Sequence, residues 1–127
     1  MRKKIITMAV VIILLASLCL AEQWLVLRLT NGALEETRQI LALIRAGDME
    51  AAQEKTHALD RLWDEKAQML EVLVDHSATD DVRYALSKLS AALESSDVSA
   101  SLIYAGELEG GVEHVLERQE LSIENVL

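Results

Sequence analysis

The sequence lacks proline and phenylalanine altogether, and its 127 residues include only five glycines and one cysteine. Without proline, no residue forces a helix to end. Alanine, leucine, glutamate and valine dominate instead, and this composition favours helices. The single Cys19 excludes a disulfide within the chain and lies in an apolar run, where we expect a small lipid-facing side chain.

Acidic residues are missing from the first part of the chain, since all 21 of them lie at Glu22 or later. The basic residues Arg2, Lys3 and Lys4 precede an uncharged run over residues 5–21. As a helix this run is about 25 Å long, close to the lower limit for crossing a bilayer. Apolar residues resume at Trp24, whose indole suits the headgroup level.

Two interpretations of this segment remain open. Residues 5–27 form an uncleaved transmembrane anchor, or a signal peptide is cut after Ala21, where Cys19 and Ala21 are small enough for cleavage. We favour the anchor because apolar residues continue past the cut. The basic start then predicts a single-pass protein of the cell membrane, with a cytoplasmic tail at residues 1–4 and an extracytoplasmic domain at 28–127. The lipid bilayer is its first expected partner.

The part after residue 21 has nine basic against 21 acidic residues, a formal charge of −12. This charge argues against nucleic acid as a partner, because its phosphates require a basic surface. Electrostatic partners would be basic surfaces or cations.

Apolar periodicity predicts four helical segments. The first covers residues 22–45 and continues the anchor, with Leu25, Leu29, Ala33, Ile40 and Ile44 on one face and a local kink at Asn31-Gly32. Residues 46–48 break the chain, and Asp48 caps a second helix that extends to about residue 75. Its predicted apolar face comprises Ala51, Ala58, Leu59, Leu62, Trp63, Met69, Leu70, Leu73 and Val74.

A polar connection over residues 75–81 precedes the third helix, which we expect at about 81–94 with Thr79 or Asp80 as its cap. Ser96 or Asp97 caps the fourth, in which Gly110-Gly111 either bends the helix or lets another helix approach. Short links make neighbouring helices antiparallel. The sequence therefore predicts an all-α fold, in which an N-terminal transmembrane helix continues into an up-down bundle of about four amphipathic helices.

Metal-ligating residues occur in two places. Glu54 and His57 have Glu-x-x-His spacing, but no second pair exists and both lie off the apolar face, so we expect no metal there. Asp75, His76, Asp80 and Asp81 cluster in the predicted connection and are weak candidates for a divalent cation. Capping and hydrogen bonding within the loop are the favoured explanation.

Two further groups are candidates for interaction. Lys66 lies one turn from Trp63, where its stem can cover the indole while its ammonium group reaches water. The last helix carries an acidic ridge, which we interpret as a solvated face or as a surface for a basic partner. Its members are Glu109, Glu113, Glu117, Glu120 and Glu124.

Catalysis has no support in the pattern. The cysteine lies in the apolar run, no serine has the glycine-flanked elbow of a nucleophile, and no glycine-rich phosphate loop follows a strand. We expect neither catalytic residues nor a cofactor.

Several motifs together resemble a known bacterial family. They are Trp63, Asp75-His76, Asp80-x-Val82-x-x-x-Leu86-x-x-Leu89, His114-Val115 and the ending from Glu120 to Val126. With the basic start and apolar first segment, they are similar to the family catalogued as domain of unknown function 4363. The resemblance implies a membrane-associated helical bundle without an assigned activity. It also implies a multi-pass membrane partner, and it singles out Trp63, Asp75, His76 and Asn125.

These observations predict a non-enzymatic accessory or interaction subunit of a cell-envelope membrane protein. The interaction candidates are Trp63, Lys66, His76, Glu109, Glu113, Glu117 and Asn125. The alternatives are a ligand- or cation-binding sensor that signals through a partner, and a secreted enzyme or metal carrier.

Overall fold

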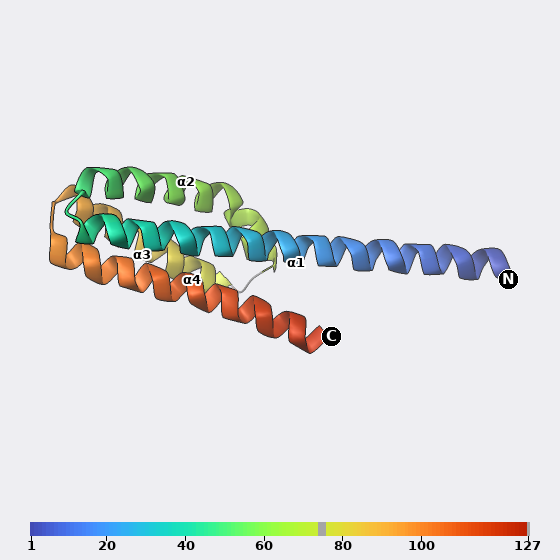
Figure 1. The fold of residues 1–127 in the computed structure, drawn as a ribbon. Coiled ribbons are helices and arrows are strands. Elements are labelled where there is room, and N and C mark those ends of the chain that lie inside the picture. Colours follow the sequence, from blue (N-terminus) through green and yellow to red (C-terminus); the bar gives the residue numbers. More distant parts are fainter. Residues whose placement is uncertain (74–75, 127) are drawn as a thin grey trace.

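The computed structural model describes residues 1–73 and 76–126, with the side chains of 68, 70–73 and 121–126 left out of the description. It contains four helices: α1 (Arg2–Arg45), α2 (Met49–Leu73), α3 (His76–Glu94) and α4 (Val98–Val126) (Figure 1). No strand occurs among the described residues. The all-α prediction is confirmed.

The helices form an up-down bundle. Helix α1 packs on α2 and α4, and α3 packs on the same two helices, whereas the diagonal pairs are not in contact within the described residues. The N-terminal half of α1 projects beyond the bundle as a straight continuation of the same helix (Figure 1). The predicted anchor and bundle are therefore parts of one architecture, joined by an unbroken helix.

Two links of identical design close the end of the bundle away from the N-terminus. After α1, the amide of Gly47 donates to Ile44 O (3.0 Å) and that of Asp48 to Leu43 O (2.9 Å). These are the two bonds of a Schellman motif. Asp48 Oδ1 then accepts from the amide of Ala51 at 3.2 Å, so the same residue caps α2 as predicted.

The link after α3 repeats this arrangement. The amide of Ser96 donates to Leu93 O (3.1 Å), that of Asp97 donates to Ala92 O (3.0 Å), and Asp97 Oδ1 caps α4 by accepting from the amide of Ala100 at 3.0 Å. Helices α1 and α2 form one hairpin, and α3 and α4 form the other. When residues are counted outward from each link, buried residues occur at the same positions in both hairpins. The matching residues are Ala33/Val82, Thr37/Leu86, Ile40/Leu89 and Ile44/Leu93 before the links, and Ala52/Ser101, Thr56/Ala105, Leu59/Leu108 and Trp63/Val112 after them.

Threonines occupy core positions that aliphatic residues would normally fill. On α1 the buried positions follow spacings of four and three, and two of them are Thr30 and Thr37. Their hydroxyls donate to Val26 O and Ala33 O, both at 2.8 Å. Thr56 of α2 does the same to Ala52 O at 2.7 Å. Each hydroxyl is thus satisfied within its own helix, and the methyl group remains for packing.

Three details of the sequence-based description are wrong. Helix α1 runs unbroken through Asn31-Gly32, because one exposed glycine in a long helix costs only about 1 kcal/mol. On α2 the predicted Leu59 and Trp63 are buried, but Ala58 and Leu62 are exposed, and the buried face is completed by Ala52, Thr56 and Ala67. Helix α3 begins at His76.

The early start of α3 changes the role of Thr79. It is buried inside the first turns of the helix, and its hydroxyl donates to His76 O at 2.9 Å. Asp75 and Val74 lie outside the described residues.

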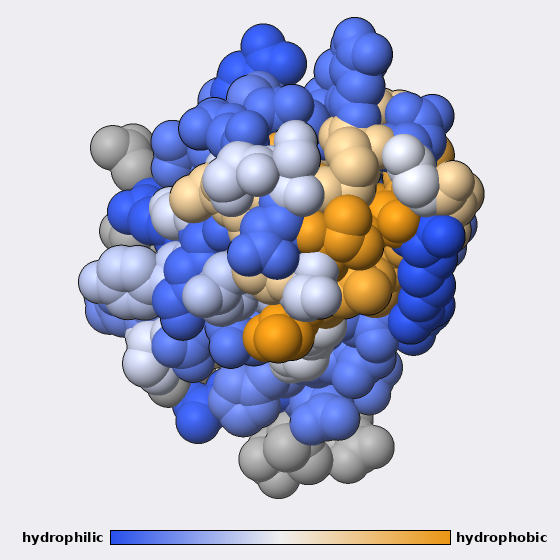
Figure 2. Space-filling view, turned by 90° about the vertical axis from the view of Figure 1, so that its left-hand side faces the viewer, coloured by the Kyte–Doolittle hydropathy of each residue, from blue (hydrophilic) through white to orange (hydrophobic). Residues whose placement is uncertain are grey.

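The end of the bundle that carries the two links is mostly hydrophilic. Seen from this end, a small apolar area lies among polar side chains (Figure 2). The exposed or half-buried apolar residues near these links are Leu43, Met49, Val98 and Leu102. Three of them pack against the core, so this area is the incompletely covered end of the core.

Candidate functional site

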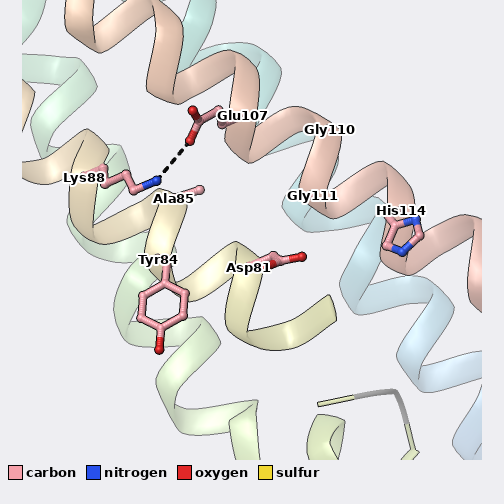
Figure 3. A pocket seen from close by; sticks show the side chains of 8 residues that line it. All are labelled: Asp81, Tyr84, Ala85, Lys88, Glu107, Gly110, Gly111 and His114. Carbon is pink, nitrogen blue, oxygen red and sulfur yellow. Dashed lines mark hydrogen bonds and ion pairs between the residues drawn. The ribbon is translucent and has the colours of Figure 1, made fainter. Parts of the chain in front are cut away.

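A groove of about 440 Å³ runs between α3 and α4 on the outside of the bundle. Asp81, Tyr84, Ala85 and Lys88 line it from α3, and Glu107, Gly110, Gly111 and His114 line it from α4 (Figure 3). Four of these eight side chains carry an acid, an amine or an imidazole. The groove therefore offers polar and charged groups in a concave surface.

Glycines make this groove possible. A Cβ atom on Gly111 would lie 3.4 Å from Val82 Cγ2, so α3 approaches α4 closely at this point. A Cβ atom on Gly110 would meet nothing within 4 Å. The predicted close approach at Gly110-Gly111 is thus present at Gly111, and α4 continues through both residues. Gly110 instead leaves space on the solvent side.

The charged side chains lie at two levels of the groove. Lys88 Nζ is 3.4 Å from Glu107 Oε2, and it lies 5.8 Å from the centroid of the Tyr104 ring. At the other level, Asp81 and His114 point towards one another from the two helices (Figure 3). Tyr84, on α3 between Asp81 and Lys88 in the sequence, is 63% exposed, and its ring points away from α4 (Figure 3).

The three described residues of the predicted cation cluster do not converge. His76 is the exposed first residue of α3, Asp80 is half-buried, and Asp81 faces the groove. Asp75 lies outside the described residues. Among the residues that are described, no three His, Cys, Asp or Glu side chains are grouped so that they could hold a metal ion.

The acidic ridge is partly neutralised within the bundle. Arg38 of α1 lies 3.9 Å from Glu109 and 3.7 Å from Glu113, and both carboxylates belong to half-buried residues. Glu117 and Glu120 are exposed, and the side chain of Glu124 is not described. Glu109 and Glu113 therefore join α4 to α1, whereas Glu117 and Glu120 face solvent.

The remaining candidates are described by their burial and by their contacts within the bundle. Trp63 is only 4% exposed and belongs to the core. It lines a small recess with Leu62 and the exposed Lys66, as expected if the lysine stem covers the indole. His57 Nε2 lies 3.8 Å from Glu94 Oε1 of α3. Glu54, which shares the Glu-x-x-His spacing with His57, is exposed. Asn125 is in α4, but its side chain is not described.

Sequence reasoning missed Tyr84, Lys88 and Glu107 as members of a common surface. They are distant in sequence and meet only because α3 and α4 are neighbours. One signal was available, because Gly106 and Gly110 are one turn apart in a helix that otherwise favours leucine and glutamate. An added Cβ atom at either position meets nothing, so packing within this chain does not require glycine there.

We compared the chain with protein families, curated proteins and solved structures, and a family model matches it. No curated protein and no solved structure matches this chain. A family model matches residues 24–126. This range begins two residues before Val26, the first buried residue of α1, and it contains α2, α3 and α4 entirely. The chain therefore belongs to the family described as a domain of unknown function, DUF4363.

Proposed function

We propose that this protein is a non-enzymatic, single-pass membrane subunit whose extracytoplasmic bundle binds a multi-pass protein of the bacterial cell envelope. The observation that carries the proposal is the division of α1 into two halves. Residues 2–21 are exposed throughout, whereas the second half contributes eight buried residues to the bundle. Among the described helices, α1 is long and apolar enough to cross a membrane.

The orientation follows from charge. Arg2, Lys3 and Lys4 precede the apolar half, and basic residues are retained on the cytoplasmic side. The bundle then lies outside the cytoplasm. An apolar helix of this length, exposed with respect to all the described residues, is accommodated by lipid and by the helices of other membrane proteins.

The face formed by α3 and α4 is the surface that we assign to the partner. It combines the exposed Tyr84 with Ile103, which is 62% exposed, and with Gly106 and Gly110, where the backbone of α4 is uncovered. Aromatic residues are enriched at interfaces, and glycines let another helix approach closely. Helix α2 lies diagonally opposite α4 and provides a control surface.

A photo-cross-linking experiment tests this assignment. A photoreactive phenylalanine replaces Tyr84 in one variant and the exposed Arg61 of α2 in the other, and both carry a C-terminal tag. After irradiation of native membranes, we expect the position-84 variant to capture one multi-pass membrane protein and the position-61 variant to capture none. Equal capture from both positions, or no specific product from position 84, would reject the proposed surface.

A second candidate function is a ligand- or cation-binding sensor that signals through a partner. It is favoured by the positions of Asp81 and His114 on opposite sides of the groove (Figure 3). Calorimetric titration with calcium and magnesium tests the cation version. Absence of heat at millimolar concentration, or unchanged heat in an Asp81→Asn variant, would exclude this groove as the site.

A further inference from the structure

Helix α1 enters the bundle without a linker. Residues 2–21 are exposed, Glu22 and Gln23 are half-buried, and Val26 is completely buried. The end of the uncharged run and the first core residue are therefore separated by only about 7 Å along the helix axis. If α1 crosses the membrane, as proposed above, the base of the bundle lies against the headgroups of the outer leaflet.

Trp24 and Arg28 form a pair on the face of α1 that points away from the core. Trp24 is 60% exposed, Arg28 is exposed, and the guanidinium carbon lies 5.3 Å from the centroid of the indole ring. This distance fits a cation–π contact. Among the described side chains, Arg28 has no carboxylate partner, since its one recorded contact is with Trp24.

The depth of this pair follows from helix geometry. Lys4 and Trp24 are separated by about 30 Å at roughly 1.5 Å per residue, which equals the thickness of a bilayer core. With Lys4 at the inner headgroups, Trp24 reaches the outer headgroup level, where tryptophan is enriched. Arg28 lies about 6 Å farther out, at the level of the phosphates.

We propose that Trp24 and Arg28 form a binding site for the phosphate of an outer-leaflet phospholipid, and that this site seats the base of the bundle on the membrane surface. The guanidinium group supplies two parallel donors to phosphate oxygens, and the indole ring holds the guanidinium while facing the acyl chains. The site adds a specific lipid contact to the proposed membrane anchoring, on which it rests.

The first test measures the depth of Trp24 in the full-length chain reconstituted into phosphatidylcholine vesicles. The vesicles contain lipids brominated either just below the headgroup or near the bilayer centre. We expect the shallow bromines to quench tryptophan fluorescence more strongly, and we expect this excess to disappear in Trp24→Phe, which retains only the buried Trp63. Stronger quenching by the deep bromines would overturn the proposed depth.

The second test measures the contact itself. Arginine labelled with ¹³C at the guanidinium carbon is observed by solid-state NMR, with dephasing by the ³¹P of the lipids. We expect part of the short-range dephasing to be lost in Arg28→Gln and none to be lost in Arg45→Gln, a matched change of an exposed arginine at the C-terminal end of the same helix.

The outcomes separate this inference from membrane anchoring. Unchanged dephasing in Arg28→Gln, with the protein still in the vesicles, would overturn the lipid site and leave the anchor intact. Failure of the protein to remain with the vesicles would overturn both. If inorganic phosphate in a phosphorus-free detergent reproduces the dephasing, the site binds free phosphate and the assignment to lipid is wrong.

Discussion

Ser96 is the residue that most clearly departs from the local rule for its position. Its φ is +55°, and the equivalent residue of the other link is Gly47 with φ +83°. The left-handed conformation costs a residue with a side chain about 1–2 kcal/mol. Glycine at this position would avoid that cost, but it loses more backbone entropy on folding, which offsets part of the benefit.

We therefore expect Ser96→Gly to raise the free energy of unfolding by about 0.5–1 kcal/mol. Urea denaturation followed by circular dichroism measures it. The reciprocal change Gly47→Ser should lower stability by a similar amount, because a Cβ atom at Gly47 meets nothing and only the backbone is affected. A loss of stability in Ser96→Gly would show that the serine side chain has a role in the link.

Ser90 carries a buried hydroxyl with no hydrogen-bond partner. An unsatisfied polar group in the interior costs about 1–3 kcal/mol, and alanine also favours the helix. Ser90→Ala should therefore stabilise the bundle by about 1 kcal/mol in the same denaturation experiment. Ser101→Ala is the matched control, because that buried hydroxyl donates to Asp97 O at 2.6 Å and its removal should bring no gain. Equal effects in the two variants would contradict this reasoning.

Trp63 tests the difference between a core residue and an interaction residue. Its side chain is almost fully buried in the cluster shared by all four helices. Trp63→Ala should lower the unfolding free energy by about 3–5 kcal/mol. Lys66→Ala, one turn away and exposed, should change it by less than about 0.5 kcal/mol. If Trp63→Ala leaves the unfolding free energy unchanged but abolishes partner binding, Trp63 is an interaction residue and not a core residue.

At the scale of the element, α4 carries two glycines that packing against the other described residues does not require. Gly106 and Gly110 are exposed, and added Cβ atoms would meet nothing. Replacing each by alanine should stabilise the helix by about 0.5–1 kcal/mol. Gly111→Ala should bring less, because its Cβ atom would lie 3.4 Å from Val82 Cγ2. Thermal unfolding of the three variants measures these changes. A lower melting temperature after substitution of Gly106 or Gly110 would contradict the expectation, because it would show that the glycine is needed for a close contact.

At the scale of the whole molecule, the apolar half of α1 contributes no buried residue to the described part of the bundle. The buried residues of α1 all lie at Val26 or later, and the family match begins at Trp24. We expect a fragment of residues 22–127 to be monomeric in detergent-free buffer, highly helical and cooperative in unfolding. Size-exclusion chromatography and circular dichroism measure this. A fragment that needs detergent to fold would show that the anchor stabilises the bundle directly.

Ion pairs cross every contact between neighbouring helices, but each contributes little to stability. Lys55–Glu36 joins α2 to α1 at 3.3 Å, Arg83–Asp64 joins α3 to α2 at 3.5 Å, and Lys88–Glu107 joins α4 to α3. All involve substantially exposed side chains, and such pairs contribute little each. The bundle is therefore held mainly by its apolar interior.

Much of this organisation is determined by the sequence alone. The basic start and the uncharged run define the apolar half of α1, and glycine and aspartate at 46–48 specify a helix end and the next helix start. The same aspartate signal at Asp97 gives the second link. These features are readable because helix formation, capping and apolar periodicity depend on residues within a few positions of each other. The predicted start of α3 is wrong because Thr79 and Asp80 look like caps, whereas Thr79 is buried inside the helix and its hydroxyl donates to His76 O in the first turn.

Only the tertiary structure decided which side chains meet. It turned half of the acidic ridge towards Arg38, buried Trp63, and separated Asp81 from His76 by placing it in the groove opposite His114. Each helix pattern allows several neighbours and several vertical registers. The choice among them depends on how the buried residues of all four helices fill one interior, which no single stretch of sequence contains.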